Sequence, residues 1–144
     1  MKHSDEMLAQ CVCTRVRTVS RLVTKMYDDI LRPTGLKASQ LALLAAIDSM
    51  DAPSIVALSK ALHMDRTTLS RNLLPLVSAS LVAVQEDGYG RSKATKLTSK
   101  GNATLKAAFP LWRKAQADLM RKLGQDLSET MEKQLHQLKP ATNE

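Results

Sequence analysis

Long apolar runs are missing from this sequence. No stretch approaches the ~18–20 apolar residues that a helix needs to cross a bilayer. The first ten residues, MKHSDEMLAQ, also lack the apolar segment of a signal peptide. We therefore expect a cytoplasmic protein with no membrane partner.

Cysteine is scarce as well, because the chain has only Cys11 and Cys13. Side chains two residues apart on a helix point to nearly opposite sides, so no structural disulfide is expected between them. Reduced thiols agree with a cytoplasmic location. Together with the scattered His3, His63 and His136, the two cysteines do not supply a four-ligand set, so we predict no metal site.

Motifs of the common enzyme classes are absent too. The sequence contains no glycine-rich phosphate-binding loop, no cluster of metal ligands and no supported Ser/His/Asp arrangement. A Cys-x-Cys pair without a βαβ pattern is weak evidence for an oxidoreductase. We predict a protein that is not an enzyme and needs no cofactor.

What the sequence does contain is an excess of positive charge. Its 144 residues include 21 Lys and Arg against 14 acidic residues, a formal net charge of +7. This excess favours a polyanionic partner such as nucleic acid, although a merely basic protein has the same composition. The 44% hydrophobic content is enough for one domain over residues 1–144.

Helical periodicity marks both ends of the chain. Apolar residues recur at spacings of three and four through residues 8–30, and Pro33 and Gly35 end this helix. Two further helices are predicted over roughly 99–122 and 127–138. Such long amphipathic helices leave too little chain to cover them, so a second subunit is their simplest cover.

Between these ends, the pattern indicates a helix, a tight turn and a second helix. They follow a nearly all-apolar helix over about 39–50, for which Ser39 is the expected N-cap. Ser54 can cap the first helix of the pair, and a turn at His63 leads to Asp65, another good N-cap. We expect the 39–50 helix to be the most buried element.

The helix after Asp65 combines an apolar side with an unusual group of polar side chains. The apolar side is predicted from Leu69, Leu73, Leu76 and Val77, and the polar group is Arg66, Thr67, Thr68, Ser70, Arg71 and Asn72, with Asn72 nearest the apolar side. Arginine can donate two hydrogen bonds to guanine, asparagine can pair with adenine, and hydroxyls reach bases or phosphates. This chemistry matches the DNA major groove, although an ordinary solvated face is the alternative.

A β-hairpin is predicted directly after this helix. Val82 and Val84 alternate with polar residues, DGYG supplies the turn, and a second extended run reaches Leu97. Arg91 and Lys93 follow the glycine tip, so the hairpin forms a positively charged wing that can grip the backbone or enter the minor groove. Double-stranded DNA is therefore the expected partner.

The order of these pieces resembles the MarR family of bacterial regulators over nearly the whole chain. The matching segments are GLKASQLALLAAI (35–47), IVALSKALHMDRTTLSRNLLPLVSASLV (55–82) and LTSKG (97–101). The resemblance implies a mainly α (α+β) fold. A winged helix-turn-helix over about 38–98, with a small β-hairpin wing, would lie between dimerisation helices at about 4–32 and 99–140.

The resemblance also implies a function, that of a homodimer that binds a pseudo-palindromic operator and represses transcription until an effector lowers its DNA affinity. Position by position, it assigns groove contacts to Arg66, Thr67, Thr68, Ser70 and Arg71, and the wing arginine to Arg91. This chain departs from the family pattern at His63, where glycine is usual, and at Tyr89, where the wing commonly has Asp. The alternative is a winged-helix architectural or protein-interaction module without sequence-specific recognition.

Two kinds of effector stay open. Cys13 lies fourteen residues before Tyr27, as in the branch of the family that senses organic hydroperoxides, and Arg17 can stabilise a thiolate. Cys11 and Cys13 can equally bind a thiophilic metal or metalloid between subunits, or simply pack in the dimer interface.

The second kind of effector is a small aromatic or hydrophobic ligand in a cleft between the dimerisation helices and the DNA-binding lobe. Met26, Tyr27 and Trp112 can line such a cleft, but residues of these types at helical spacing are more often core.

Overall fold

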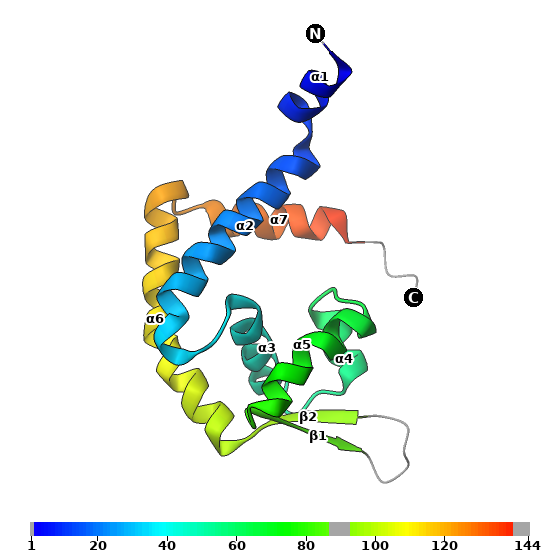
Figure 1. Ribbon diagram of the computed structural model, residues 1–144, viewed down its shortest axis with the longest axis vertical. Helices are drawn as coiled ribbons and strands as arrows, with labels where there is room; N and C mark the ends of the chain where they lie inside the picture. Colours follow the sequence, from blue (N-terminus) through cyan, green and yellow to red (C-terminus); the bar gives the residue numbers. More distant parts are fainter. Residues whose placement is uncertain (1, 87–92, 140–144) are drawn as a thin grey trace.

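The computed structural model describes residues 2–86 and 93–139. Over this part the protein is mainly helical with one antiparallel hairpin, which confirms the expected winged helix-turn-helix fold (Figure 1). The elements are α1 (His3–Gln10), α2 (Val12–Leu31), the short 3₁₀ helix η1 (Arg32–Thr34), α3 (Ala38–Ser49), α4 (Ile55–Ala61), α5 (Arg66–Ser78), β1 (Val82–Glu86), β2 (Lys93–Leu97), α6 (Ser99–Leu123) and α7 (Leu127–Leu138). None of the described helices combines the length and apolar character that spanning a membrane requires.

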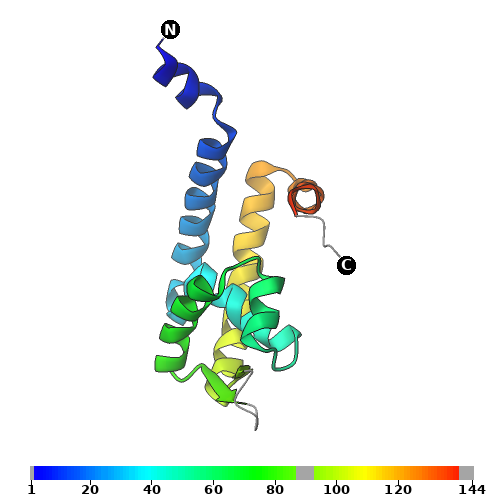
Figure 2. The same cartoon turned by 90° about the vertical axis from the view of Figure 1, so that its right-hand side faces the viewer.

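Two long helices form a scaffold that carries a smaller lobe. Helices α2 and α6 run side by side, and α3, α4, α5 and the hairpin make up the lobe at one end of them (Figures 1 and 2). Helix α1 extends away from the body beyond the start of α2, and α7 leaves the far end of α6. The predicted break between the last two helices is confirmed at Gly124.

The prediction of one continuous helix through residues 8–30 is wrong. The chain breaks at Cys11, which has extended backbone angles (φ −65°, ψ 107°), ends α1 and begins α2 as its N-cap. Its Sγ accepts a hydrogen bond from the Thr14 amide at 3.5 Å. Because the apolar periodicity continues across the break, the sequence pattern did not show it. The predicted end of this region is confirmed, since Gly35 follows η1 in a left-handed conformation (φ 73°).

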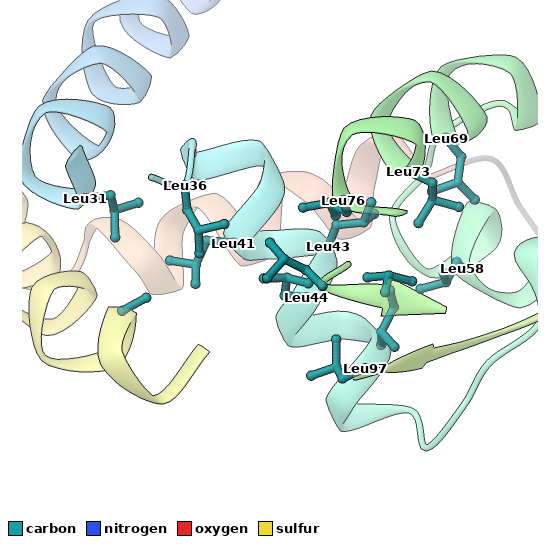
Figure 3. Close-up of a cluster of buried hydrophobic side chains, with 14 residues drawn as sticks. Leu31, Leu36, Leu41, Leu43, Leu44, Leu58, Leu69, Leu73, Leu76 and Leu97 are labelled. Atoms are coloured by element: carbon teal, nitrogen blue, oxygen red, sulfur yellow. The ribbon is translucent and has the colours of Figure 1, made fainter. Parts of the chain in front are cut away.

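Leucines from most elements of the lobe form its core, and Figure 3 shows how they converge. Helix α3 supplies Leu41, Leu43, Leu44 and Ile47, in agreement with its predicted burial. Fully burying each such side chain is worth roughly 1.5–3 kcal/mol. The expected N-cap at Ser39 is wrong, because the cap residue is Lys37.

Helix α3 is instead anchored by the scaffold. Asp28 on α2 accepts a hydrogen bond from the Ala38 amide at 2.7 Å, which satisfies one of the free donors at the start of α3. Asp28 therefore joins the first turn of a lobe helix directly to the scaffold.

The segment LTSKG forms the connection between the wing and α6. Thr98 Oγ1 accepts a hydrogen bond from the Gly101 amide and donates one to the Ser80 carbonyl, while the Thr98 amide donates to the Leu81 carbonyl at 3.1 Å. A Cβ atom on Gly101 would collide with the Leu81 carbonyl oxygen. This position therefore requires glycine, and the close packing fixes the hairpin against α6.

Candidate nucleic-acid interface

Side-chain caps fix both helices of the helix-turn-helix. Ser54 Oγ accepts from the Ala57 amide at 3.0 Å, and Asp65 Oδ1 accepts from the Thr68 amide at 2.7 Å. The turn between the helices has His63 in a left-handed conformation (φ 51°), which costs a non-glycine residue roughly 1–2 kcal/mol. The predicted caps and turn are confirmed.

Helix α5 separates its apolar and polar residues onto two faces. Leu69, Leu73 and Leu76 are buried in the lobe core, but Val77 is exposed, so its predicted burial is wrong. The predicted contacts that lie together on the exposed side are Arg66, Thr67, Thr68, Ser70 and Arg71. The fold thus gathers their donors and acceptors on one accessible face.

Asn72 differs from the other predicted contacts. It is half-buried, and its Nδ2 donates to the sulfur of Met64 at 3.8 Å. The amide is thus turned toward the packing between the turn and α5, consistent with its predicted place near the apolar side.

Leu74 is a residue of this face that the sequence analysis missed. Its side chain is 64% exposed, and it lies three residues after Arg71 and seven after Thr67 on the outward side of α5. A leucine in a leucine-rich helix resembles core, and only its spacing from the polar residues distinguishes it. An apolar side chain here is suited to contact a thymine methyl group.

The N-cap of α5 also holds a polar side chain of the exposed face. Asp65 Oδ2 accepts a hydrogen bond from Thr68 Oγ1 at 3.0 Å, in addition to the amide bond at Oδ1. Hydrogen bonding by the Thr68 amide and hydroxyl lowers the pKa of the Asp65 carboxyl. Asp65 is therefore ionised at neutral pH.

The hairpin is held at its base. Strands β1 and β2 pair from Val82↔Leu97 to Glu86↔Lys93. The buried Thr95 donates twice to the Pro53 carbonyl, from its amide at 2.9 Å and from Oγ1 at 2.8 Å, so β2 is fixed to the loop before α4.

Of the predicted wing residues, Lys93 is exposed on β2. Arg91 and Tyr89 lie outside the described residues.

The proposed thiol-sensing residues lie on the scaffold, away from the lobe. Cys11 and Cys13 are free thiols, and hydrogen bonding by Thr14 lowers the pKa of Cys11. Cys13 and Tyr27 are fourteen residues apart on the single helix α2, about 21 Å, so they do not form a site within one chain. Arg17 is exposed, one turn after Cys13.

Tyr27 instead links the two scaffold helices. Its hydroxyl donates to Gln116 Oε1 on α6 at 2.6 Å, and partial burial raises its pKa. In the described part of the chain, no three His, Cys, Asp or Glu side chains form a group that could hold a metal ion.

A cavity of about 660 Å³ lies where α2, α3 and α6 meet. Its lining is mostly apolar, with Lys106 and Asp48 as the charged members. Tyr27 and Trp112 line it, whereas Met26 is not among its lining residues. Trp112 is 37% exposed and stacks on Phe109 with ring centroids 5.7 Å apart, so it is not a core residue.

A helix-turn-helix with an exposed Arg, Thr and Ser face, followed by an anchored hairpin, defines a winged helix-turn-helix DNA-binding protein. M. tuberculosis transcriptional regulator MosR, solved with DNA, is 32% identical to this chain, with a TM-score of 0.76, covering 90% of this chain and all of that one. The chain belongs to the MarR family of DNA-binding transcriptional regulators, which are not enzymes.

Two more distant structures share the fold. An E. coli MarR mutant with operator DNA is 24% identical, with a TM-score of 0.80, covering 93% of this chain and 97% of that one. Bordetella bronchiseptica BpsR, whose DNA binding is regulated by 6-hydroxynicotinic acid, is 21% identical, with a TM-score of 0.78, covering 92% and 96%. Comparison of the sequence with family models finds no match, and comparison with curated proteins finds none either.

Proposed function

We propose that this protein is a cytoplasmic repressor that binds a pseudo-palindromic DNA operator as a homodimer and releases it when an effector binds. The observation that carries the proposal is the exposed polar face of α5, fixed in place by the Asp65 cap. The structures of MosR and MarR with DNA support a DNA-binding role for this fold.

In this proposal α5 enters the major groove and the wing contacts the backbone or the minor groove. Base and phosphate contacts come from Arg66, Thr67, Thr68, Ser70 and Arg71, with Asn72 in a supporting position and Arg91 and Lys93 on the wing. Two copies carry twice the formal charge of +7, so DNA affinity falls steeply with salt.

Unpaired apolar faces support a homodimer. The exposed apolar residues of α1 and α2 are Met7, Leu8, Val12, Val16, Val19 and Leu22, and those of α7 are Met131, Leu135 and Leu138. Side chains of this kind, spread over helices at both chain ends, are covered by a second copy in our proposal. A two-fold axis between the copies then places the two α5 helices on successive turns of the duplex.

Selection of random duplexes by the reduced protein at near-physiological salt tests the proposal. We expect enrichment of a palindrome whose half-sites lie about one helical turn, roughly 34–36 Å, apart. Binding without any enriched sequence would instead support an architectural or protein-interaction role, because charge alone does not discriminate sequences.

The cavity between scaffold and lobe is the proposed effector site. Its walls come from α3 of the lobe and from α2 and α6 of the scaffold, so an occupant touches both. A ligand that fits only one arrangement of lobe and scaffold shifts the protein toward that arrangement. The mostly apolar lining favours a small aromatic ligand, and of the two charged lining residues, Lys106 and Asp48, Lys106 can pair with an acidic group on it.

We expect 1-naphthoate to quench the fluorescence of Trp112, the only tryptophan, and to weaken operator binding in parallel. Ala42→Phe, which fills the cavity from α3, should abolish both effects, whereas Ala103→Phe on the exposed surface of α6 should not. Quenching with unchanged operator affinity would count against an effector role for the cavity.

Oxidation of the cysteine thiols is the second candidate effector signal. The lowered pKa of Cys11, at the start of α2, favours it. Adding hydrogen peroxide to the same operator complex distinguishes thiol oxidation from ligand binding in the cavity. Release that Cys13→Ser or Cys11→Ser prevents would assign sensing to that thiol. Unchanged affinity with the thiols shown to be oxidised would leave Cys11 and Cys13 as packing residues.

A further inference from the structure

Thr68 differs from the other hydroxyl residues of the exposed face because Asp65 holds its side chain. One carboxylate oxygen of Asp65 accepts from the Thr68 amide at 2.7 Å, and the other accepts from Thr68 Oγ1 at 3.0 Å. Asp65 makes no such bond to the hydroxyls of Thr67 and Ser70 among the described contacts. The two bonds fix the position of the Thr68 hydroxyl before any partner arrives.

The direction of this hydrogen bond follows from counting protons. An ionised carboxylate has no proton to give, so it can only accept. A threonine hydroxyl has one proton and two lone pairs. The proton of Thr68 therefore points at Asp65, and only lone pairs remain for an outside partner.

Thr68 is also in the right place to contact a base. It is the third residue of α5 and is exposed. In the helix-turn-helix arrangement, residues near the N-terminus of the second helix approach the base edges in the major groove. The fixed lone pairs of Thr68 thus lie where bases are distinguished.

Bases differ in the group that they present at this edge. Adenine and cytosine present an amino group that donates hydrogen bonds, whereas guanine O6 and thymine O4 accept them. We propose that Thr68, held by Asp65, is a specificity-determining residue that selects adenine or cytosine over guanine or thymine at one position of each half-site. This proposal rests on the proposed function, since it needs a base in the groove.

Asp65→Asn provides the sharpest test because it reverses the hydrogen bond with little change in shape. Asparagine is as good an N-cap as aspartate, and its oxygen can still accept from the Thr68 amide. Its amide nitrogen then donates to Thr68 Oγ1, which frees the hydroxyl proton for the DNA. In random-duplex selection, we expect the wild type to prefer adenine or cytosine at one half-site position by about three- to tenfold, and Asp65→Asn to shift that position toward guanine or thymine.

Comparing bases within one protein removes the general effect of the lost charge. Added positive potential strengthens binding to every duplex alike, whereas the proposed effect changes the ranking of bases at one position.

Three further variants test whether the Thr68 hydroxyl is the group responsible for the base preference. Thr68→Val keeps the shape but has no hydroxyl, so the preference at this position should disappear, while Thr68→Ser should retain it. Thr67→Val, the same change one residue away, should leave this position unaltered. Replacing the selected adenine by purine, which lacks the amino group, should weaken binding of the wild type about three- to tenfold and leave Thr68→Val unaffected.

The outcomes separate this inference from the proposed function. If the wild type enriches no sequence, the proposed function fails. If it enriches an operator but Thr68→Val keeps every base preference, or if Asp65→Asn leaves the selected bases unchanged, the role of Thr68 is wrong and the regulator proposal stands. Thermal unfolding of each variant shows that it is folded under the selection conditions.

Discussion

Replacing Val19 with aspartate should dissociate the proposed homodimer and raise the operator Kd by at least about 100-fold. Val19 is 50% exposed in the single chain, on the apolar side of α2 that we propose a second copy covers. In the dimer the substitution would bury two unpaired carboxylates, which is far more costly than leaving them in water. A monomer also loses the gain from two linked half-site contacts.

Analytical ultracentrifugation and operator titration, run on the same samples, check this prediction. Thr14→Asp is a matched control, because it makes the same charge change on the opposite, polar side of α2. It should remain dimeric and keep operator affinity within a few-fold. A dimeric Val19→Asp protein with wild-type affinity would place the subunit interface elsewhere.

Replacing Arg71 with alanine should cost about 1–3 kcal/mol of binding free energy on the selected operator and clearly less on random DNA. Arg71 is exposed on the outward side of α5, in the group of polar residues on the helix that Asp65 caps. A guanidinium can donate two hydrogen bonds to one guanine, and this discrimination exists only where that guanine is present. Random duplexes lose mainly the attraction of one positive charge.

Competition binding at a fixed salt concentration measures both losses. Arg71→Lys keeps the charge but not the paired donors, so it should lose operator specificity and retain most of the affinity for random DNA. Arg17→Ala removes an exposed arginine from α2 and should lower both affinities slightly and equally. Equal losses on operator and random DNA for Arg71→Ala would mean that this arginine contacts phosphates only.

The local sequence was sufficient to predict most of the DNA-binding lobe. Ser54 and Asp65 were recognised as caps, and Val82 to Leu97 as a hairpin, because these signals depend on neighbouring residues and the backbone between them. The polar residues of α5 were recognised as one face because a helix repeats every 3.6 residues. The family resemblance added the expectation of an operator and of an effector.

Features that depend on contacts between distant residues were not predictable in this way. The cap at Cys11 interrupts a helix whose apolar spacing continues unbroken, and the start of α3 is set by Asp28 from another helix rather than by Ser39. The exposure of Val77 and of Leu74 was also decided by which side of α5 the lobe covers.

The sequence by itself determined most of the helices and strands of this protein and the polar face of α5, because helix caps, turns and periodicity act over a few residues. Only the tertiary structure decided that a cavity opens between α3 and the scaffold, and that Asp28 of α2 holds the start of α3. A cavity exists only once three helices are packed, and a carboxylate of one helix can accept from the first amides of another only once the two helices are in contact.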